Sequence, residues 1–185
     1  MARGFVTGLI ALLFVNVVQA AERGPEQALI NAGKKGIVAA QLLLGSQYLM
    51  GLHAPQDYKK AHTWYGKAAN QGDPKAQTVL GLLHLVGTGV EANATRAATW
   101  FQLAALQGSG EAQLSLATLY AEGKGVDQDV VEAHMWYSLA IENLSIGESL
   151  TEAVHLRNML AAKMSREQLA EARIRTRGVS AFAIR

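Results

Sequence analysis

The sequence of 185 residues contains no cysteine and only three prolines. The absence of cysteine excludes disulfide bonds, thiolate catalysis and zinc sites with cysteine ligands. Charged residues make up 17% of the chain, and a formal net charge of +2 is too small an excess to predict binding of nucleic acid. A hydrophobic fraction of 50% argues against disorder, and the length fits one domain with a small appendage. Eighteen glycines against three prolines favour helices separated by glycine turns.

Residues 1–20 have the layout of a secretory signal peptide. Arg3 supplies a positive charge, an apolar run from Phe5 to Val18 follows, and small or permissive residues precede a cut after Ala20. The apolar run is shorter than the about 20 residues that a membrane-spanning helix needs, and a retained anchor is the alternative. The sequence therefore predicts a periplasmic or secreted protein.

The middle of the sequence repeats with a period of 36 residues, in copies that span 37–72, 73–108 and 109–144. Seven positions of the repeat are identical in all three copies. They are Ala40, Ala76 and Ala112; Gln41, Gln77 and Gln113; Leu44, Leu80 and Leu116; Gly51, Gly87 and Gly123; Ala61, Ala97 and Ala133; Trp64, Trp100 and Trp136; and Ala68, Ala104 and Ala140. Self-similarity at a fixed period of this length predicts a stacked repeat architecture.

Each copy is punctuated as a helix, a turn and a second helix. In the second copy Asp73 suits a helix N-cap, Gly87 suits the end of that helix, and Asn93 suits the start of the next one. Asp129 takes the same capping role in the third copy. The invariant tryptophans are expected to fill the core between hairpins. Because one hairpin cannot bury this surface alone, the copies are expected to stack.

The recurring motif resembles the Sel1-like repeat, a relative of the tetratricopeptide repeat. It reads Ala-x-x-x-Leu-Gly/Ala, then Gly-x-Gly-Val, then Ala-x-x-Trp-aromatic-x-x-Ala-Ala, and it covers residues 37–144. The resemblance implies an all-α fold, an α/α superhelical solenoid of antiparallel helix hairpins. The first copy departs from the motif, because His53 stands where Gly89 and Gly125 stand. The conformation of that first loop is left open.

Both flanks of the repeats are expected to be capping elements, as solenoids require. Residues 21–36 align with half a repeat, and residues 145–178 are expected to form capping helices, the last one ending near Arg175, before a flexible tail at 179–185. From residue 157 to the end there are seven basic and two acidic residues. Two interpretations stay open. Arg173, Arg175 and Arg177 either complement a helix C-terminus in solvent or contact an anionic partner or membrane surface.

Candidate chemistry is sparse. His62 and His134 share one repeat position and are expected on a polar rim, whereas His84 stands where Tyr48 and Tyr120 stand and is expected in the core. The glycine loops do not follow a strand, so they are expected to end helices rather than to hold phosphate. No nucleophilic serine motif and no pair of catalytic carboxylates is recognisable. The sequence therefore predicts no enzyme, no metal and no cofactor.

The resemblance implies that the first helix of each hairpin lines the concave face, where positions that vary between copies are candidates for recognition. The predicted partner-binding residues are Leu42, Ser46, Lys75, Thr78, Leu82, Glu111, Leu114 and Thr118. The function expected from this resemblance is a non-catalytic periplasmic protein–protein interaction module, an adaptor or regulator in the cell envelope.

The expected partner is another envelope protein, and one attached to the membrane is included; no nucleic acid and no small-molecule substrate are expected. Three alternatives remain. The first is an immunity or inhibitor protein against a toxin delivered to the periplasm, and the second is an envelope enzyme acting on peptidoglycan or β-lactams. The third is a solenoid that associates with itself.

Overall fold

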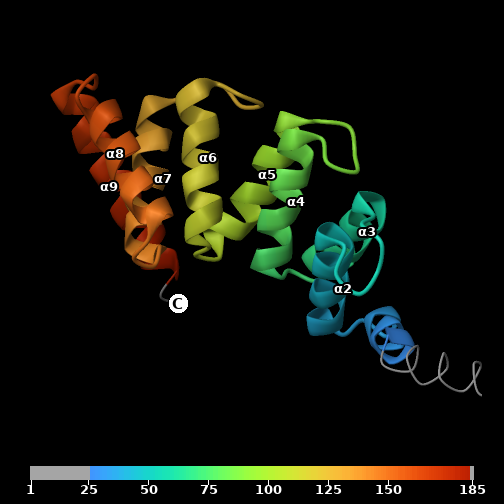
Figure 1. Ribbon diagram of the computed structural model, residues 1–185. Helices are drawn as coiled ribbons and strands as arrows, with labels where there is room; N and C mark the ends of the chain where they lie inside the picture. Colours follow the sequence, from blue (N-terminus) through green and yellow to red (C-terminus); the bar gives the residue numbers. More distant parts are fainter. Residues whose placement is uncertain (1–25, 184–185) are drawn as a thin grey trace, which may run out of the picture.

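The structure, a computed structural model, describes residues 26–183 and is built from α-helices, with no strand in that range. A helix covers residues 26–34, and eight labelled helices follow it (Figure 1). They are α2 (Val38–Met50), α3 (Tyr58–Ala69), α4 (Pro74–Val86), α5 (Ala94–Leu106), α6 (Gly110–Glu122), α7 (Val130–Asn143), α8 (Glu148–Ala161) and α9 (Arg166–Ala183). The predicted all-α solenoid is confirmed. The predicted signal peptide, residues 1–20, lies outside the described residues.

The three predicted repeats correspond to three helix hairpins that follow one another from the right to the left of Figure 1. The hairpins are α2–α3, α4–α5 and α6–α7, and each second helix also contacts the first helix of the next hairpin. The side chains of Asp73, Asn93 and Asp129 accept backbone hydrogen bonds in the first turn of α4, α5 and α7, so the predicted N-caps are confirmed. Gly87 and Gly123 end α4 and α6 in the left-handed conformation.

A buried amide links successive hairpins at the invariant glutamines. The Nε2 groups of Gln41, Gln77 and Gln113 donate to the carbonyls of Gly33, Ala69 and Ala105, at the C-terminal end of the preceding helix. Their Oε1 atoms accept from Gln71, Gln107 and Asn143 respectively. Because a buried amide must be satisfied on both sides, this repeated bond explains why glutamine occupies the same position in all three copies.

The tryptophans do not form a uniformly buried ladder. Trp64 and Trp136 are buried, but Trp100 is only partly buried, which corrects the expectation that all three lie in the core. The difference lies in what covers each ring. The ammonium of Lys67 lies 4.1 Å from the Trp64 ring centroid, and Trp136 belongs to the buried core cluster that includes residues of α6 and α8. No such cover is seen for Trp100 among the described residues, where Phe101 is the fully buried aromatic residue.

Helix α9 is longer than predicted. The last helix was expected to end near Arg175, and a flexible tail was expected from residue 179. In the structure α9 continues to Ala183. One contact beyond the predicted end explains the extension. Val179 is partly buried and packs on the core cluster that α5, α6, α7 and α8 form. This burial outweighs the about 1 kcal/mol that a glycine such as Gly178 costs inside a helix.

Candidate functional site

The exposed side of α2, α4 and α6, here called the first-helix face, carries four large apolar side chains that no described residue covers. Leu43 and Met50 lie on α2 with 48% and 63% of their surface exposed, and Leu82 and Val86 lie on α4 with 45% and 72% exposed. Residues at such spacings share one side of a helix. On α6 the corresponding side is polar and carries the exposed carboxylates Glu111 and Glu122.

The eight residues predicted to bind a partner fall into two groups. Lys75, Leu82 and Glu111 are exposed and remain available to a partner. The other five, which are Leu42, Ser46, Thr78, Leu114 and Thr118, are buried or partly buried.

Three of these five have packing roles. Leu114 belongs to the core. The Thr78 hydroxyl lies 3.1 Å from the Ser109 hydroxyl at the start of the next hairpin, and the Thr118 hydroxyl lies 3.2 Å from that of Tyr137. These contacts hold the hairpins, so variation between copies at these positions reflects different ways of packing.

Sequence reasoning missed Leu43, Met50 and Val86 as surface residues. A signal for them was present in the spacing. Leu43 and Met50 follow the exposed Ala39 by four and eleven residues, and Val86 follows the exposed Lys75 by eleven. Residues at these intervals lie on one side of a helix. The run from residue 79 to 86 is apolar on nearly every side, and periodicity alone could not tell which of its residues pack and which are exposed.

His62 and His84 meet between α3 and α4. Their rings are perpendicular with centroids 5.2 Å apart, and their Nε2 atoms lie 3.5 Å apart. His84 is buried as predicted, and His62 reaches it from the neighbouring helix instead of standing on an isolated rim. Burial lowers the pKa of both imidazoles, and a positive charge on His62 lowers that of His84 further. The pair is therefore a packing contact whose burial disfavours the charged form of both rings.

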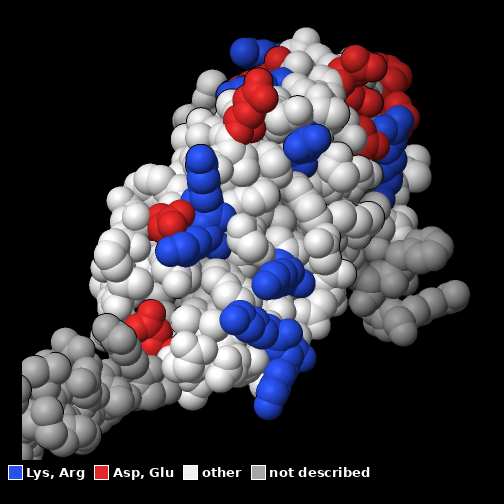
Figure 2. Space-filling model, turned by 90° about the vertical axis from the view of Figure 1, so that its right-hand side faces the viewer, with Lys and Arg blue, Asp and Glu red and all other residues white. Residues whose placement is uncertain are grey.

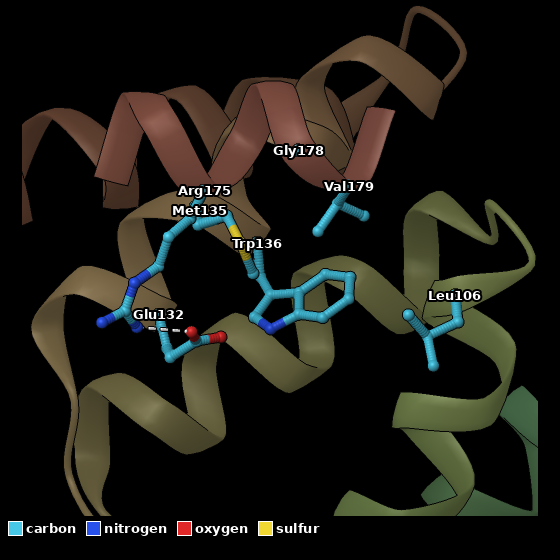
Figure 3. Close-up of a pocket in the computed structure, with 7 residues that line it drawn as sticks. All are labelled: Leu106, Glu132, Met135, Trp136, Arg175, Gly178 and Val179. Atoms are coloured by element: carbon cyan, nitrogen blue, oxygen red, sulfur yellow. Dashed lines mark hydrogen bonds and ion pairs between the residues drawn. The ribbon is translucent and has the colours of Figure 1, made fainter. Parts of the chain in front are cut away.

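A pocket of about 630 Å³ opens between α5, α7 and α9. Figure 3 shows the Trp136 indole at its centre, with Val179 and Leu106 beyond the ring and Met135 beside it. Glu132 and Arg175 line one side of the pocket and are bonded to each other. The pocket is thus an apolar hollow with an ion pair at its edge.

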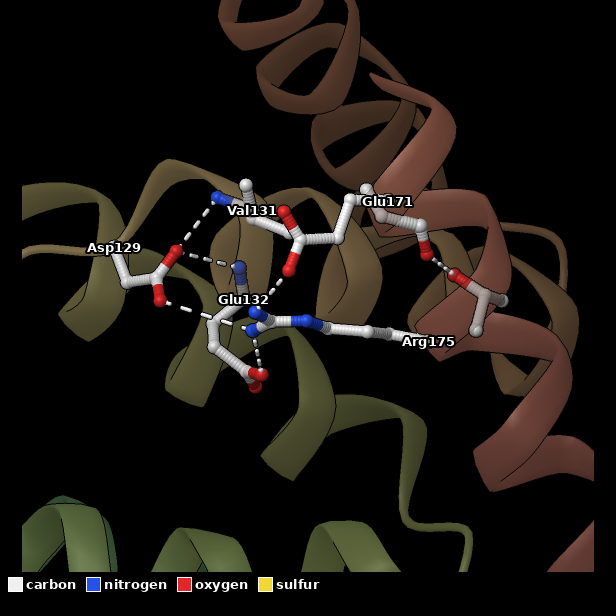
Figure 4. A network of polar contacts seen from close by, with 7 residues as sticks. Asp129, Val131, Glu132, Glu171 and Arg175 are labelled. Carbon is white, nitrogen blue, oxygen red and sulfur yellow. Dashed lines mark hydrogen bonds and ion pairs between the residues drawn. The ribbon is translucent and has the colours of Figure 1, made fainter. Parts of the chain in front are cut away.

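Arg175 ties α9 to the start of α7 (Figure 4). Its Nη1 donates to Glu132 Oε1 at 2.6 Å and lies 3.8 Å from Asp129 Oδ2, while Nη2 bonds Glu171 on its own helix. Asp129 also caps α7 by accepting from the backbone N–H groups of Val131 and Glu132. Hydrogen bonds to Glu171 and Glu132 raise the pKa of Arg175. The expectation that Arg175 only complements a helix end in solvent is wrong, because α9 runs on past it.

The N-terminal end of the solenoid is basic. Figure 2 looks onto this end and shows lysine and arginine side chains across its middle and lower part. The elements at this end carry six exposed lysines, which are Lys34, Lys35, Lys59, Lys60, Lys67 and Lys75. Two of them lie over aromatic rings, Lys60 over Tyr48 and Lys67 over Trp64. The α8–α9 end also has an excess of basic residues, so both ends of the solenoid have the same sign of charge.

Residues 26–183 contain neither a metal-binding cluster nor a helix that could span a membrane. No cluster of three or more histidines, aspartates and glutamates there has the arrangement to hold a metal ion. Within the same range, none of the helices combines the length and the hydropathy needed to cross a bilayer.

Comparison with known proteins places this architecture. The family model of the Sel1 repeat matches residues 38–73, 74–109 and 110–143. The chain is similar to a protective antigen of uropathogenic Escherichia coli strains that displays an SLR fold, with 41% identity and a TM-score of 0.62 over 63% of this chain. The match covers 25% of that antigen, so this chain corresponds to about a quarter of its length.

The chain is also similar to a Sel1 repeat protein from Oxalobacter formigenes, with 31% identity and a TM-score of 0.64. That match covers 72% of this chain and 97% of the other. No curated protein matches the chain. Three matched repeats, over more than half of the sequence, together with the hairpin geometry show that the chain belongs to the Sel1-repeat family.

Proposed function

We propose that this protein is a non-catalytic binding module of the bacterial cell envelope that holds another protein on its first-helix face. Sel1-repeat proteins generally mediate protein–protein interaction, and their fold is typically a non-catalytic scaffold. The observation that carries the proposal is the set of four exposed apolar side chains on α2 and α4. Exposed apolar residues that share one face mark interaction surfaces, whereas scattered ones need no explanation.

The chemistry of the face specifies the partner. Leu43, Met50, Leu82 and Val86 offer apolar contact on two successive first helices, and Glu111 and Glu122 offer negative charge on the third. The partner is therefore a protein segment with apolar residues for α2 and α4 and basic residues for α6. The like charge on the two ends of the solenoid opposes end-to-end stacking of copies, which is one route to self-association.

Crosslinking in living cells tests the face. A photoreactive residue at position 43, 82 or 86 is expected to capture one dominant envelope protein, and the same residue at position 103 is expected to capture none. Leu103 is a matched control, since it lies on the second helix α5 with 44% exposure against 45% for Leu82. If all positions capture the same set of proteins, or position 82 captures none, the first-helix face is not the binding surface.

Affinity then shows whether the face supplies binding energy. With the captured protein purified, Leu82→Glu is expected to weaken binding by about tenfold or more, because truncation or charging of a central apolar contact costs over about 1.4 kcal/mol. Leu103→Glu should leave the affinity unchanged. Both variants should unfold at the temperature of the wild type, since both side chains are half exposed. An equal loss in the two variants would contradict the proposal.

The location in the envelope rests on residues 1–20 and has a separate test. The chain recovered from a periplasmic extract is expected to have the mass of a protein that begins at Ala21, as cleavage after Ala20 requires. A full-length chain found only in the membrane fraction would support the retained anchor instead. A full-length chain in the cytoplasm would contradict export altogether.

A further inference from the structure

A second pocket, of about 490 Å³, lies between α7, α8 and α9, on the side of α9 away from the Trp136 pocket. Three arginines line it: Arg157 comes from α8, and Arg173 and Arg177 come from successive turns of α9. His134 of α7 lines it as well. The pocket therefore gathers three of the seven basic residues of the C-terminal segment. Two of them, Arg173 and Arg177, are among the arginines that the sequence left with two interpretations.

The three guanidinium groups are not neutralised by the part of the chain that the structure describes. Within residues 26–183, none of Arg157, Arg173 and Arg177 has a carboxylate within 4.0 Å. Arg157 donates to the amide oxygen of Asn158. Arg175, on the other side of the same helix, is bonded to two carboxylates. Only one acidic residue, Glu142, lines the pocket.

His134 is the one buried titratable residue of the pocket lining, with 8% of its surface exposed. Its Nδ1 atom is fully buried and has no hydrogen-bond partner among the described residues, as is also true of Nδ1 of His84. Burial lowers the pKa of His134, and the charges of Arg157 and Arg173 lower it further.

We infer that this pocket binds a small hydroxylated molecule through a phosphate or carboxylate group held by Arg157, Arg173 and Arg177. The planar guanidinium presents parallel N–H donors that match the oxygens of both kinds of anion. Ser138 and Thr176 also line the pocket, and their hydroxyls donate to carbonyls of their own helices. Their oxygens, with the Glu142 carboxylate, are therefore acceptors for hydroxyl groups of the ligand.

Thermal unfolding of the full mature chain with two probes tests the inference. Glycerol 3-phosphate carries a phosphate group and citrate carries carboxylates, and each is compared with sodium chloride at equal ionic strength. A ligand that binds only the native state raises the unfolding temperature in proportion to its concentration over its Kd. At least one probe is expected to raise it above the chloride control, and the probe that does so identifies the anionic group.

Charge-matched variants separate the pocket from general attraction of anions. Arg173→Gln combined with Arg177→Gln is expected to weaken binding, measured by calorimetry, by about tenfold or more, because two charge-assisted bonds are lost. Lys163→Gln combined with Arg166→Gln removes the same charge from two exposed residues, one in the link between α8 and α9 and one at the start of α9, and should leave binding unchanged. Arg157→Gln provides an independent variant on α8 if the double substitution perturbs folding.

Two results would overturn the inference. One is that neither probe raises the unfolding temperature beyond the chloride control. The other is that the Lys163 and Arg166 substitutions weaken binding as much as those at Arg173 and Arg177. Because the pocket is remote in sequence from the first-helix face and uses none of its residues, either result leaves the proposed function untouched.

Discussion

Replacing Phe101 with alanine is expected to lower the free energy of unfolding by about 3–5 kcal/mol, the range for truncation of a buried aromatic residue. Phe101 is fully buried in the second hairpin. Its ring lies against Gly81 of α4 so closely that a Cβ atom at Gly81 would collide with it. The pair allows α4 and α5 to approach, and alanine at position 101 would leave a cavity that the rigid hairpin cannot close. Urea-induced unfolding measures the loss.

Trp100→Ala is the matched comparison, because it removes a larger ring from the neighbouring position. Trp100 is only partly buried, so its truncation is expected to cost about 2 kcal/mol or less, in proportion to the apolar area removed from water. If Trp100→Ala lowers the free energy of unfolding as much as Phe101→Ala or more, the tryptophan positions are the main core positions. The different burial of Trp100 and Phe101 would then not determine how much each contributes to stability.

Gly125→Ala is expected to lower the free energy of unfolding by about 3 kcal/mol, from a strained backbone and an overpacked contact. Gly125 has a φ of 77°, in the left-handed region that an L-residue with a Cβ atom disfavours. A Cβ atom there would also collide with the backbone of Ala94, at the start of α5 in the preceding hairpin. The second glycine of the loop is therefore where one repeat contacts the previous one. Urea-induced unfolding measures the loss of free energy of unfolding in the variant.

Gly108→Ala separates the two causes. Gly108 has a φ of 85°, yet a Cβ atom there would have no neighbour within 4 Å. It should therefore lose only the about 1–2 kcal/mol of the left-handed backbone. The excess in Gly125→Ala reports the collision between hairpins. Equal losses in the two variants would mean that the loop does not press on the preceding hairpin.

The same contact explains why the first copy of the repeat departs from the motif. His53 occupies the position of Gly89 and Gly125 and has a φ of 61°, close to their values of 76° and 77°. The loop conformation left open by the sequence is therefore retained. A Cβ atom at Gly89 would collide with Tyr58 of the preceding hairpin. Among the described residues, the helix at 26–34 precedes the first copy, and His53 is exposed, so its side chain has room.

The predictions that held rest on local chemistry that recurs every 36 residues. The caps Asp73, Asn93 and Asp129 bond the backbone within three residues, and such short-range bonds are legible in a sequence. Gln77 was recognisable in the sequence because glutamine occupies the same position in all three copies of the repeat. Its bond to Ala69 of the preceding helix was not, because the partner is a backbone carbonyl of another hairpin.

The predictions that failed concern contacts between elements far apart in the chain. Leu114 was taken for a binding residue but is buried against neighbouring helices, and variation between copies cannot distinguish a recognition position from a packing position. The end of α9 was placed near Arg175 on local signals, while the packing of Val179 on the core carries the helix to Ala183. For the same reason Arg175 meets Glu132, a partner 43 residues away in the chain.

The sequence by itself determined the hairpin, its period, its caps and the family. The same local interactions recur in three copies of the repeat, so each copy supports the assignment of the others. Only the tertiary structure decided which apolar residues stay exposed on the first-helix face and which aromatic residue is fully buried. It alone brought Arg157, Arg173 and Arg177 together around His134. The physical reason is that burial and charge clustering are set by the stacking of helices, and stacking joins residues whose distance along the chain carries no signal.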